Sequence, residues 1–308
     1  MAGLKGRDFL NMADLTPQEL AQLLMLAGKL KRGEVRPSCD RQVLGLLFRK
    51  SSTRTRVSFS TAMWQVGGQV LDLNVNMTQV SRGEPIKDTA RVLDRYLDIL
   101  AIRTYEQAEL QEFADYANIP VINALTDLEH PCQILADLMT VQEVFGDQLA
   151  GLTLTYLGDG NNVAHSLMLG CALAGMHVRV ATPANYRPDA TVVAQAQKLA
   201  GDRCTITLTE DPQAAVEGAQ VLYTDVWASM GQEDVAASRV PIFQPYQVNG
   251  ELLGLADKEA IVLHCLPAHR GEEITDEVIE GTQSRVWDEA ENRMHAQKAL
   301  LVELLGAA

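Results

Sequence analysis

Four hydroxyl side chains and four cations stand within eight consecutive residues, Arg49-Lys50-Ser51-Ser52-Thr53-Arg54-Thr55-Arg56. The apolar run 43–48 that precedes them is typical of a buried strand, and apolar residues recur at helical spacing after them. The first N–H groups of a helix have no partner within the helix, so hydroxyls and guanidinium groups at a helix start can complete an anion site. The segment predicts a phosphate site; the alternative is an ordinary Ser/Thr cap with solvated arginines.

A second polar segment, His130-Pro131-Cys132-Gln133, places an imidazole and a carboxamide three residues apart at an expected helix start. At that spacing both side chains can face one point. A neutral imidazole and an amide N–H can donate to a carbonyl oxygen that gains negative charge during attack. The alternative is a His-Pro turn with Gln133 on the surface.

Two further polar segments follow expected buried strands. Asp225 begins the first, which runs to Gly231. A carboxylate there suits an ammonium group and Ser229 suits a carboxylate, but Asp225 could also be only a helix cap. The second segment contains His264 and Cys265. We interpret Cys265 as a thiol near cations with a pKa low enough to handle protons, and a buried inert cysteine is the alternative.

Other chemistries find weaker support. A zinc site is not predicted, because His264, Cys265 and His269 have no second pair at ligand spacing. The stretch 158–163 resembles a dinucleotide fingerprint, but Val163 replaces the third glycine and no carboxylate for a ribose follows the next strand. We favour the interpretation that Asn162 in this stretch contacts a different ligand or caps a helix. The segment Glu291-Asn292-Arg293 either only begins a helix or also places the Arg293 side chain at the site.

Composition narrows the possible partners. The 308 residues include 26 Lys+Arg and 40 Asp+Glu, a net charge of −14, which argues against nucleic acid or anionic membranes. No signal peptide, targeting motif or apolar run of membrane length is present. Five scattered cysteines without C-x-x-C pairs indicate free thiols in a reducing, cytoplasmic location.

Alternating strand and helix patterns predict an α/β protein with two doubly wound parallel sheets joined by interdomain helices. We expect a first domain over 1–133, with a last helix at 292–305 packing back on it, and a second domain over 134–291. A helix over 133–144 is the expected bridge. The expected strands of the two sheets are 43–48, 69–73, 99–102, 120–124, 152–157, 177–181, 205–209, 220–225 and 260–264. Arg103, Asn162, Asp225 and Cys265 follow strands, where ligands bind in such sheets.

Four motifs taken together resemble those of the carbamoyltransferases, and among them the ornithine carbamoyltransferases. They are S-T-R-T-R at 52–56, H-P-C-Q at 130–133, Asp225 with S-M-G at 229–231, and H-C-L-P at 264–267. The resemblance spans nearly the whole chain. Arg49, Ser51 and Ser81 depart from the residues we expect at those places, which affects loop geometry and not the reaction.

The resemblance implies three groups of residues. Carbamoyl phosphate is expected to contact Ser52, Thr53, Arg54, Thr55, Gln79, Arg103, His130, Pro131, Cys132 and Gln133. L-ornithine is expected to contact Asn162, Asp225, Ser229, Met230, Cys265 and Leu266. The residues expected to act in the reaction are Arg103, His130, Gln133, Asp225, Cys265 and Arg293.

The resemblance further implies transfer of a carbamoyl group to the δ-amine of ornithine in arginine biosynthesis, by a homotrimer or a multiple of trimers, with no metal or organic cofactor. Two alternatives remain open from the sequence: a sister enzyme that uses putrescine or an acylated ornithine, and a nicotinamide-dependent oxidoreductase that rests only on residues 158–163.

Overall fold

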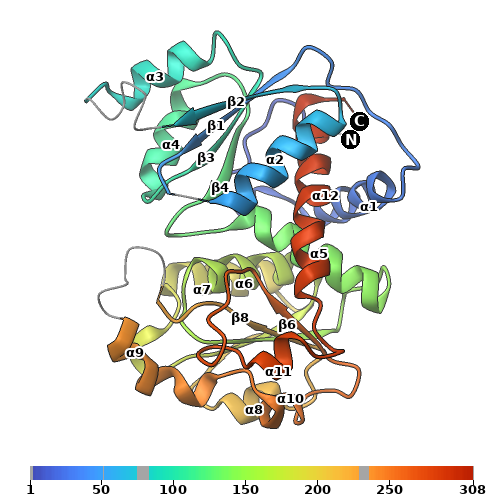
Figure 1. Cartoon of the computed structure of the whole chain (residues 1–308), viewed down its shortest axis with the longest axis vertical. Coiled ribbons are helices and arrows are strands. Elements are labelled where there is room, and N and C mark those ends of the chain that lie inside the picture. The colour runs from blue at the N-terminus through green and yellow to red at the C-terminus, as the bar shows by residue number, and fades with distance from the viewer. Residues whose placement is uncertain (1–2, 51, 75–82, 229–235, 308) are drawn as a thin grey trace. The chain divides into compact units, whose positions relative to one another are not determined.

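The computed structural model describes residues 3–50, 52–74, 83–228 and 236–307. The chain divides into two compact units, Met1–Ala136 with Arg293–Ala308, and Asp137–Asn292 (Figure 1). The division predicted after residue 133 falls three residues before this boundary, and the one predicted after 291 falls one residue before it. Gln79, Ser229 and Met230 lie outside the described residues.

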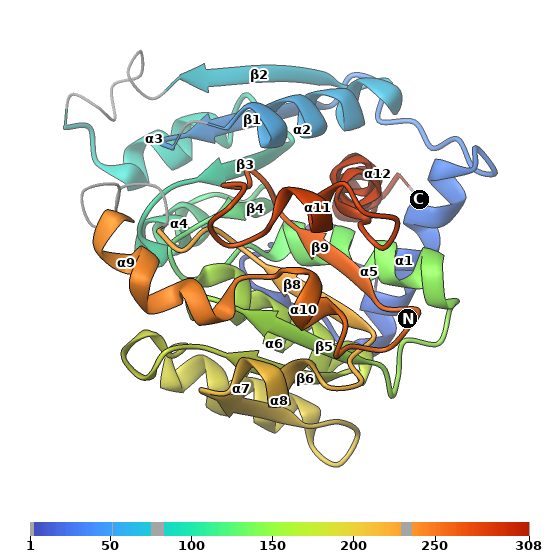
Figure 2. The ribbon, with the colours of Figure 1, turned by 60° about the horizontal axis from the view of Figure 1, so that its bottom comes forward.

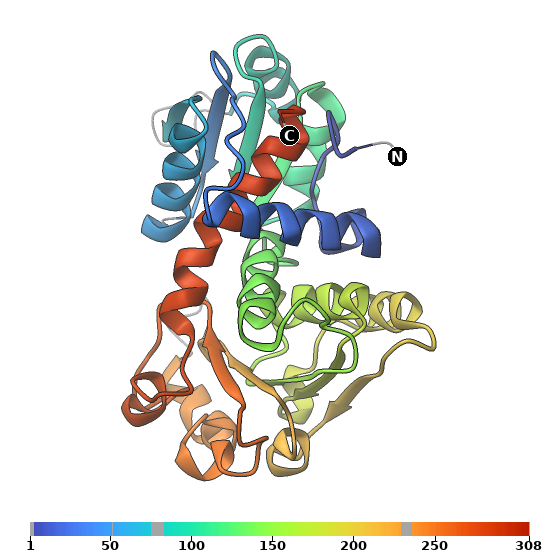
Figure 3. The ribbon, with the colours of Figure 1, turned by 90° about the vertical axis from the view of Figure 1, so that its right-hand side faces the viewer.

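The first unit contains a parallel sheet in the order β2 (Gln69–Asn74), β1 (Val43–Phe48), β3 (Ile99–Arg103), β4 (Val121–Leu125). The chain moves outward from β1 to the edge strand β2 and then crosses back to β3 on the other side of β1. With right-handed connections, this change of direction places α2 (Thr53–Gln65) on one face of the sheet, and α3 (Ile86–Leu93) and α4 (Gln107–Tyr116) on the other (Figures 1 and 3). Leu110 and Phe113 of α4 are fully buried against β3 and β4. This unit also contains α1 (Pro17–Lys31), which starts at a capping box formed by Thr16 and Glu19.

The second unit contains a parallel sheet in the order β7 (Ile206–Thr209), β6 (His177–Ala181), β5 (Thr153–Leu157), β8 (Val221–Thr224), β9 (Ile261–His264). Two helices, α6 (Asn162–Ala174) and α7 (Ala190–Ala200), pack together on one face (Figure 2). The other face is covered by α8 (Pro212–Val216), α10 (Gly250–Leu253) and α11 (Asp276–Ile279), whose buried side chains form one core with β5, β8 and β9. The short helix α9 (Ala236–Phe243) follows β8 in the chain. The two parallel sheets, each with helices on both faces, confirm the predicted α/β fold class.

Two helices contain the boundaries between the units: α5 (Pro131–Phe145) and α12 (Val286–Leu305). The predicted start of the last helix at residue 292 is wrong, because α12 begins at Val286 and Glu291-Asn292-Arg293 lie within it. Its first turns bury polar side chains such as Glu289, Asn292 and Arg293, so the apolar spacing that reveals a helix is missing there. No helix of the described residues is long and apolar enough to cross a membrane.

Candidate functional site

Three strands of the first sheet end side by side at the edge that holds the predicted phosphate site. Phe48 of β1 pairs with Arg103 of β3, and Arg103 pairs with Leu125 of β4. The backbone N–H of Arg49 donates to the Arg103 carbonyl at 2.8 Å. Because the strands are parallel, the segments that follow them, including the starts of α2 and α5, emerge at one edge.

A hydroxyl caps the start of α2, as both interpretations of this segment predict. Ser52 is the N-cap, and its Oγ accepts from the Thr55 N–H at 3.2 Å. The buried Thr55 hydroxyl also accepts from Arg293 Nη2 at 2.9 Å and lies 2.8 Å from Ser52 Oγ. The structure therefore brings Arg293, from α12, to the start of α2, 238 positions earlier in the chain.

The four cations of the segment 49–56 differ in their partners. Three form ion pairs with carboxylates of the same unit: Arg49 with Glu109 at 2.5 Å, Lys50 with Asp127, and Arg56 with Asp72 at 2.7 Å. The fourth, Arg54, lies exposed in the first turn of α2. Within the part of the chain that the structure describes, Arg54 has no carboxylate partner. Arg54 is thus the cation of this segment whose charge the described protein does not offset.

The predicted residues Arg103, His130 and Gln133 are all buried. The alternative that Gln133 lies on the surface is therefore wrong. Burial, and then the charges of Arg293 and Arg103, lower the pKa of His130 well below its ordinary value. His130 is a neutral imidazole at pH 7, as the sequence analysis required of a hydrogen-bond donor. We call Arg54, Thr55, Arg103, His130, Gln133 and Arg293 the cation cluster.

Three further predicted contacts of carbamoyl phosphate are Cys132, Pro131 and Thr53. Cys132 is fully buried, and its thiol donates to the Asn123 carbonyl at 3.3 Å. Burial raises its pKa to about 12, so this thiol belongs to the core and a substrate contact here must use the backbone. Pro131 is the first residue of α5, a position that needs no N–H, and Thr53 is exposed.

In the second unit the carboxylate of Asp225, directly after β8, accepts two hydrogen bonds from neutral groups. Asn161 Nδ2 donates to Oδ2 at 2.8 Å, and the Cys265 thiol, directly after β9, donates to Oδ1 at 3.1 Å. Asp225 is only 6% exposed. Among the described residues it has no cationic partner. We call Asn161, Asp225 and Cys265 the carboxylate cluster.

The predicted low pKa of Cys265 is wrong. Burial, and then the charge of Asp225, raise the pKa of this thiol well above its ordinary value. The sequence analysis assumed nearby cations, whereas the groups that act on Cys265 are the carboxylates of Asp225, Glu289 and Asp137. Cys265 is therefore a neutral hydrogen-bonding thiol at pH 7 and not a thiolate.

Asn161 was missed in the sequence analysis, which singled out Asn162. Asn161 is the N-cap of α6: its Oδ1 accepts from Val163 N and Ala164 N, while its Nδ2 reaches Asp225. Asn162 is the first residue of the helix and is partly buried, so the alternative that Asn162 caps the helix is wrong. An Asn directly before an expected helix was the available signal.

Leu266, another predicted contact, follows Cys265 with a φ of 58°. A residue with a Cβ is strained in this left-handed region, and such strain is common at functional sites. The N–H of Leu266 donates to His264 Nδ1 at 2.9 Å, which fixes the turn after β9.

The glycine-rich stretch 158–163 does not form an open phosphate loop. A Cβ on Gly160 would lie 2.3 Å from Pro188 N and 2.5 Å from the Arg187 carbonyl carbon. The side of this glycine that a pyrophosphate approaches in a dinucleotide fold is filled by the protein's own backbone. Asp159 forms an ion pair with Arg239 at 2.7 Å.

Asp225, His264 and Cys265 each place one possible metal-ligand atom within 4.8 Å of the others. Those side chains also make hydrogen bonds within the protein, since Cys265 donates to Asp225 and His264 Nε2 lies 3.1 Å from Glu273 Oε1.

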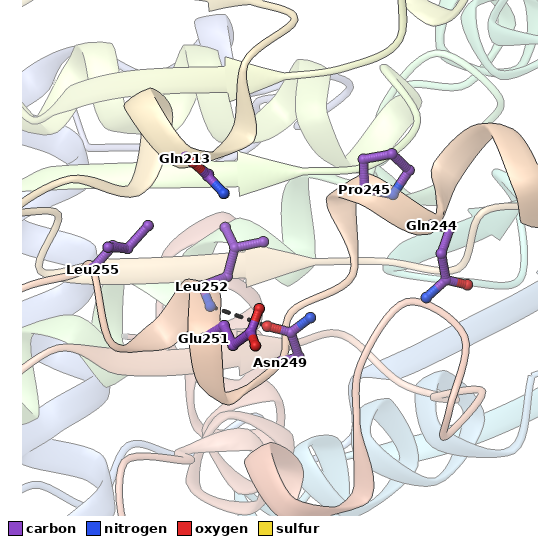
Figure 4. Close-up of a pocket in the computed structure, with 7 residues that line it drawn as sticks. All are labelled: Gln213, Gln244, Pro245, Asn249, Glu251, Leu252 and Leu255. Carbon is purple, nitrogen blue, oxygen red and sulfur yellow. Dashed lines mark hydrogen bonds between the residues drawn. The ribbon is translucent and has the colours of Figure 1, made fainter.

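A separate hollow of about 370 Å³ lies between α8, the turn 244–246 and α10 (Figure 4). None of the predicted site residues lines it; its lining is Gln213, Gln244, Pro245, Asn249, Glu251, Leu252 and Leu255.

Both parts of the chain match models of one protein family. Residues 7–143 match the model described as "Aspartate/ornithine carbamoyltransferase, carbamoyl-P binding domain". Residues 150–304 match "Aspartate/ornithine carbamoyltransferase, Asp/Orn binding domain".

Individual relatives are similar over their whole length. The ornithine carbamoyltransferase of Nostoc sp. is 70% identical over 307 residues, covering 100% of each chain. The crystal structure of ornithine carbamoyltransferase from Gloeobacter violaceus is 57% identical, covers 98% of this chain and 100% of its own, and superimposes with a TM-score of 0.90. The ornithine carbamoyltransferase from Pyrococcus furiosus is 47% identical, with full coverage of both chains and a TM-score of 0.95.

These similarities leave no support for the oxidoreductase alternative, which rested on residues 158–163 alone. The order of the motifs, the two parallel sheets and the matches over both units agree with one another. The chain belongs to the aspartate/ornithine carbamoyltransferase family of transferases, and its full-length relatives are ornithine carbamoyltransferases.

Proposed function

We propose that this chain transfers the carbamoyl group of carbamoyl phosphate to the δ-amine of L-ornithine, giving L-citrulline and phosphate. The single observation that carries this proposal is the buried Asp225 carboxylate, bonded by Asn161 and Cys265 and without a cation among the described residues. Keeping a carboxylate away from water is costly unless a cation or several donors compensate it. A substrate ammonium group supplies that cation.

The cation cluster is assigned to carbamoyl phosphate. The N–H groups at the start of α2 and the guanidinium of Arg54 bind the phosphate, whose leaving charge Arg54 and Arg103 stabilise. Thr55, Arg103, neutral His130 and Gln133 donate to the carbonyl oxygen as negative charge develops there. Arg293 donates to Thr55 and so orients that hydroxyl.

The carboxylate cluster is assigned to ornithine, together with Asn162, Leu266, Ser229 and Met230. The nucleophile must be the neutral amine, because a protonated amine has no lone pair for attack. A neutral Cys265 thiol held by Asp225 can accept a hydrogen bond from the δ-amine and orient its lone pair without carrying a charge of its own.

The leaving phosphate is already activated, so positioning and fixed dipoles are sufficient for the reaction and it needs neither metal nor organic cofactor. We further propose that the chain acts in arginine biosynthesis in the cytoplasm as a homotrimer. The apolar side chains of Val57, Trp64 and Leu71, exposed on α2 and on the edge strand β2, support an assembly through this part of the first unit. Light scattering that gives the mass of a single chain would contradict the trimer.

The decisive experiment is a citrulline colour assay with carbamoyl phosphate and L-ornithine, run beside putrescine and an acylated ornithine. We expect product from ornithine and at most traces from the other two amines, which lack either the α-carboxylate or the free α-ammonium group. Preference for putrescine or the acylated substrate would establish the sister activity, and no product from any amine would reject carbamoyl transfer to this class of acceptor.

A further inference from the structure

Glu289 is a buried carboxyl that neither the motifs nor the proposed mechanism uses. It lies on α12 and is 1% exposed. Its Oε2 accepts from the backbone N–H of His264 at 2.8 Å, and its Oε1 accepts from the hydroxyl of Tyr223 at 3.2 Å. One side chain therefore bonds both β9, at its last residue, and β8, one residue before its end.

The residues held by Glu289 immediately precede the carboxylate cluster. Tyr223 is two residues before Asp225, and His264 is directly before Cys265. The two strands are paired there, with Tyr223 opposite Leu263. The 3.1 Å hydrogen bond between Cys265 and Asp225 joins the residues that follow the two strands, so its length depends on how those strand ends are held.

A second path links Glu289 to the other oxygen of Asp225. The ring of Tyr223 stacks on Tyr156, with centroids 6.1 Å apart. Tyr156 donates its hydroxyl to Asn161 Oδ1 at 3.3 Å, and Asn161 Nδ2 donates to Asp225 Oδ2 at 2.8 Å. Glu289 is thus connected to Oδ1 of Asp225 through β9 and to Oδ2 through the two tyrosines and Asn161.

Glu289 shares its surroundings with a second carboxyl. The side chain of Asp137, also fully buried, hydrogen-bonds Glu289. Two carboxyls can form such a bond only when one of them carries a proton. Burial and the charge of Asp137 raise the pKa of Glu289 well above its ordinary value. A glutamine at position 289 therefore imitates the native group better than an apolar residue of similar size does.

We propose that Glu289 is a positioning residue for the amine-binding end of the site, and that it holds Asp225 and Cys265 at hydrogen-bond distance through its bonds to Tyr223 and His264. The inference rests on the proposed function of that pair as the ornithine site. It assigns a positioning role to a residue outside the proposed substrate contacts.

The test compares Glu289→Leu with Glu289→Gln. Leucine removes both acceptors, and we expect the KM for ornithine to rise and kcat to fall by roughly tenfold each, as expected when the hydrogen bonds that fix a reacting pair are lost. The KM for carbamoyl phosphate should stay within about twofold, because the cation cluster keeps its own contacts. Glutamine can accept from His264 N–H and donate to the Tyr223 hydroxyl, so it should restore both constants to within roughly threefold.

The matched control is Glu143→Ala, which removes another carboxyl contact between α5 and α12, the 2.8 Å bond from Asn292 Nδ2. The bond between Glu143 and Asn292 joins α5 to α12 and not to β8 or β9, so its loss should leave ornithine kinetics native. Thermal unfolding of all variants separates lost stability from lost positioning.

A readout without substrates is the pH dependence of Cys265 alkylation, followed on the Cys265 peptide by mass spectrometry. The titratable groups that act on this thiol are Asp225, Glu289 and Asp137. If leucine at 289 loosens the bond to Asp225, alkylation should begin at lower pH, while the Gln and Glu143→Ala proteins should match the native profile. A merely structural role would lower the melting temperature and leave this profile unchanged.

A folded Glu289→Leu protein with native ornithine kinetics and a native alkylation profile would overturn the proposal. If that variant does not fold, Tyr223→Phe decides in its place, with an expected rise in ornithine KM of about threefold, and native values there would equally overturn it. Failure of the proposed function is distinguishable, because the alkylation profile is measured on the free enzyme and does not depend on citrulline being formed.

Discussion

The cation cluster and the carboxylate cluster carry their charges in different ways. In the first unit the charges of Arg103 and Arg293 both act on the buried His130, and three of the four cations in the segment 49–56 are paired with carboxylates. Among the described residues the fourth cation, Arg54, has no carboxylate partner. In the second unit the carboxylate of Asp225 accepts hydrogen bonds from two neutral donors, Asn161 and Cys265, and has no cationic partner within the described part of the chain. Each cluster keeps a charge that the described protein does not neutralise, and the signs are opposite. This difference is the reason for proposing an anion as the ligand of one cluster and an ammonium group as the ligand of the other.

The largest effect is expected from Arg54→Ala. Losing the cation that has no carboxylate partner among the described residues should lower kcat/KM for carbamoyl phosphate by roughly 10²- to 10³-fold, or about 3–4 kcal/mol. This is the usual result of removing a charged oxyanion partner. Steady-state kinetics with carbamoyl phosphate as the varied substrate measures it.

Arg56→Ala is the matched control, because Arg56 lies two residues away and is already paired with Asp72. A partly exposed ion pair contributes little, so the expected loss is under about fivefold. Similar losses in the two variants would show that the segment acts through its total charge and not through Arg54.

Asp225→Asn tests the cluster of opposite sign. The amide keeps the shape but removes the charge, and kcat/KM for ornithine should fall by roughly 30- to 100-fold, the range of a lost charge-assisted hydrogen bond. Asp211→Asn is the control, since Asp211 is an exposed N-cap of α8 in the same unit and asparagine caps equally well. Unchanged ornithine kinetics in Asp225→Asn would mean that the ammonium group binds elsewhere.

A smaller effect is expected from Cys265→Ala. It removes one hydrogen bond to Asp225, so turnover should fall and ornithine KM should rise by roughly three- to tenfold, without unfolding. Cys204→Ala removes a buried thiol of the same unit and should change stability alone. Native constants in the Cys265 variant would make Cys265 a core residue.

The smallest expected effect is that of pH on the kinetics of the unmodified protein, which should differ between the two substrates. Turnover should rise through neutrality as the ornithine amine loses its proton, whereas the KM for carbamoyl phosphate should show no inflection near pH 6.5. Because the pKa of His130 is lowered, its contribution to stability is complete above the unfolded value of about 6.5 and is lost as the pH falls below it. An inflection in carbamoyl phosphate KM that disappears in His130→Gln would show that His130 titrates in the working range.

The two clusters also differ in how much of them the sequence revealed. Ser52, Arg54 and Thr55 stand within four residues and follow a strand, so local rules for helix starts were enough to predict their arrangement. Asn161, Asp225 and Cys265 come from three separate strand ends. Their order in the sheet, β5-β8-β9, is not encoded in any short pattern, so the sequence did not show that these three side chains meet. Asn161 itself was missed although its place directly before a helix is a local signal for an N-cap.

Charge partners were the least predictable feature. Cys265 was expected near cations, but the carboxylates that raise its pKa include Asp137 and Glu289, which are far from it in sequence. Long-range packing also explains why the first turns of α12 were not predicted. Their buried side chains are polar, so the apolar spacing typical of a helix is missing there. Strand positions, in contrast, depend on local runs of apolar residues, and each predicted strand overlaps one in the structure.

The hydrogen bond from Arg293 to Thr55 spans 238 positions of the chain. During synthesis on a ribosome, the residues around Thr55 emerge long before α12 exists. The first sheet can therefore form while the edge proposed to bind carbamoyl phosphate still lacks Arg293. The bond from Arg293 to Thr55 therefore cannot form until α12 has been synthesised. A nascent chain released before residue 286 would lack α12 entirely and could not hold the Thr55 hydroxyl in this way.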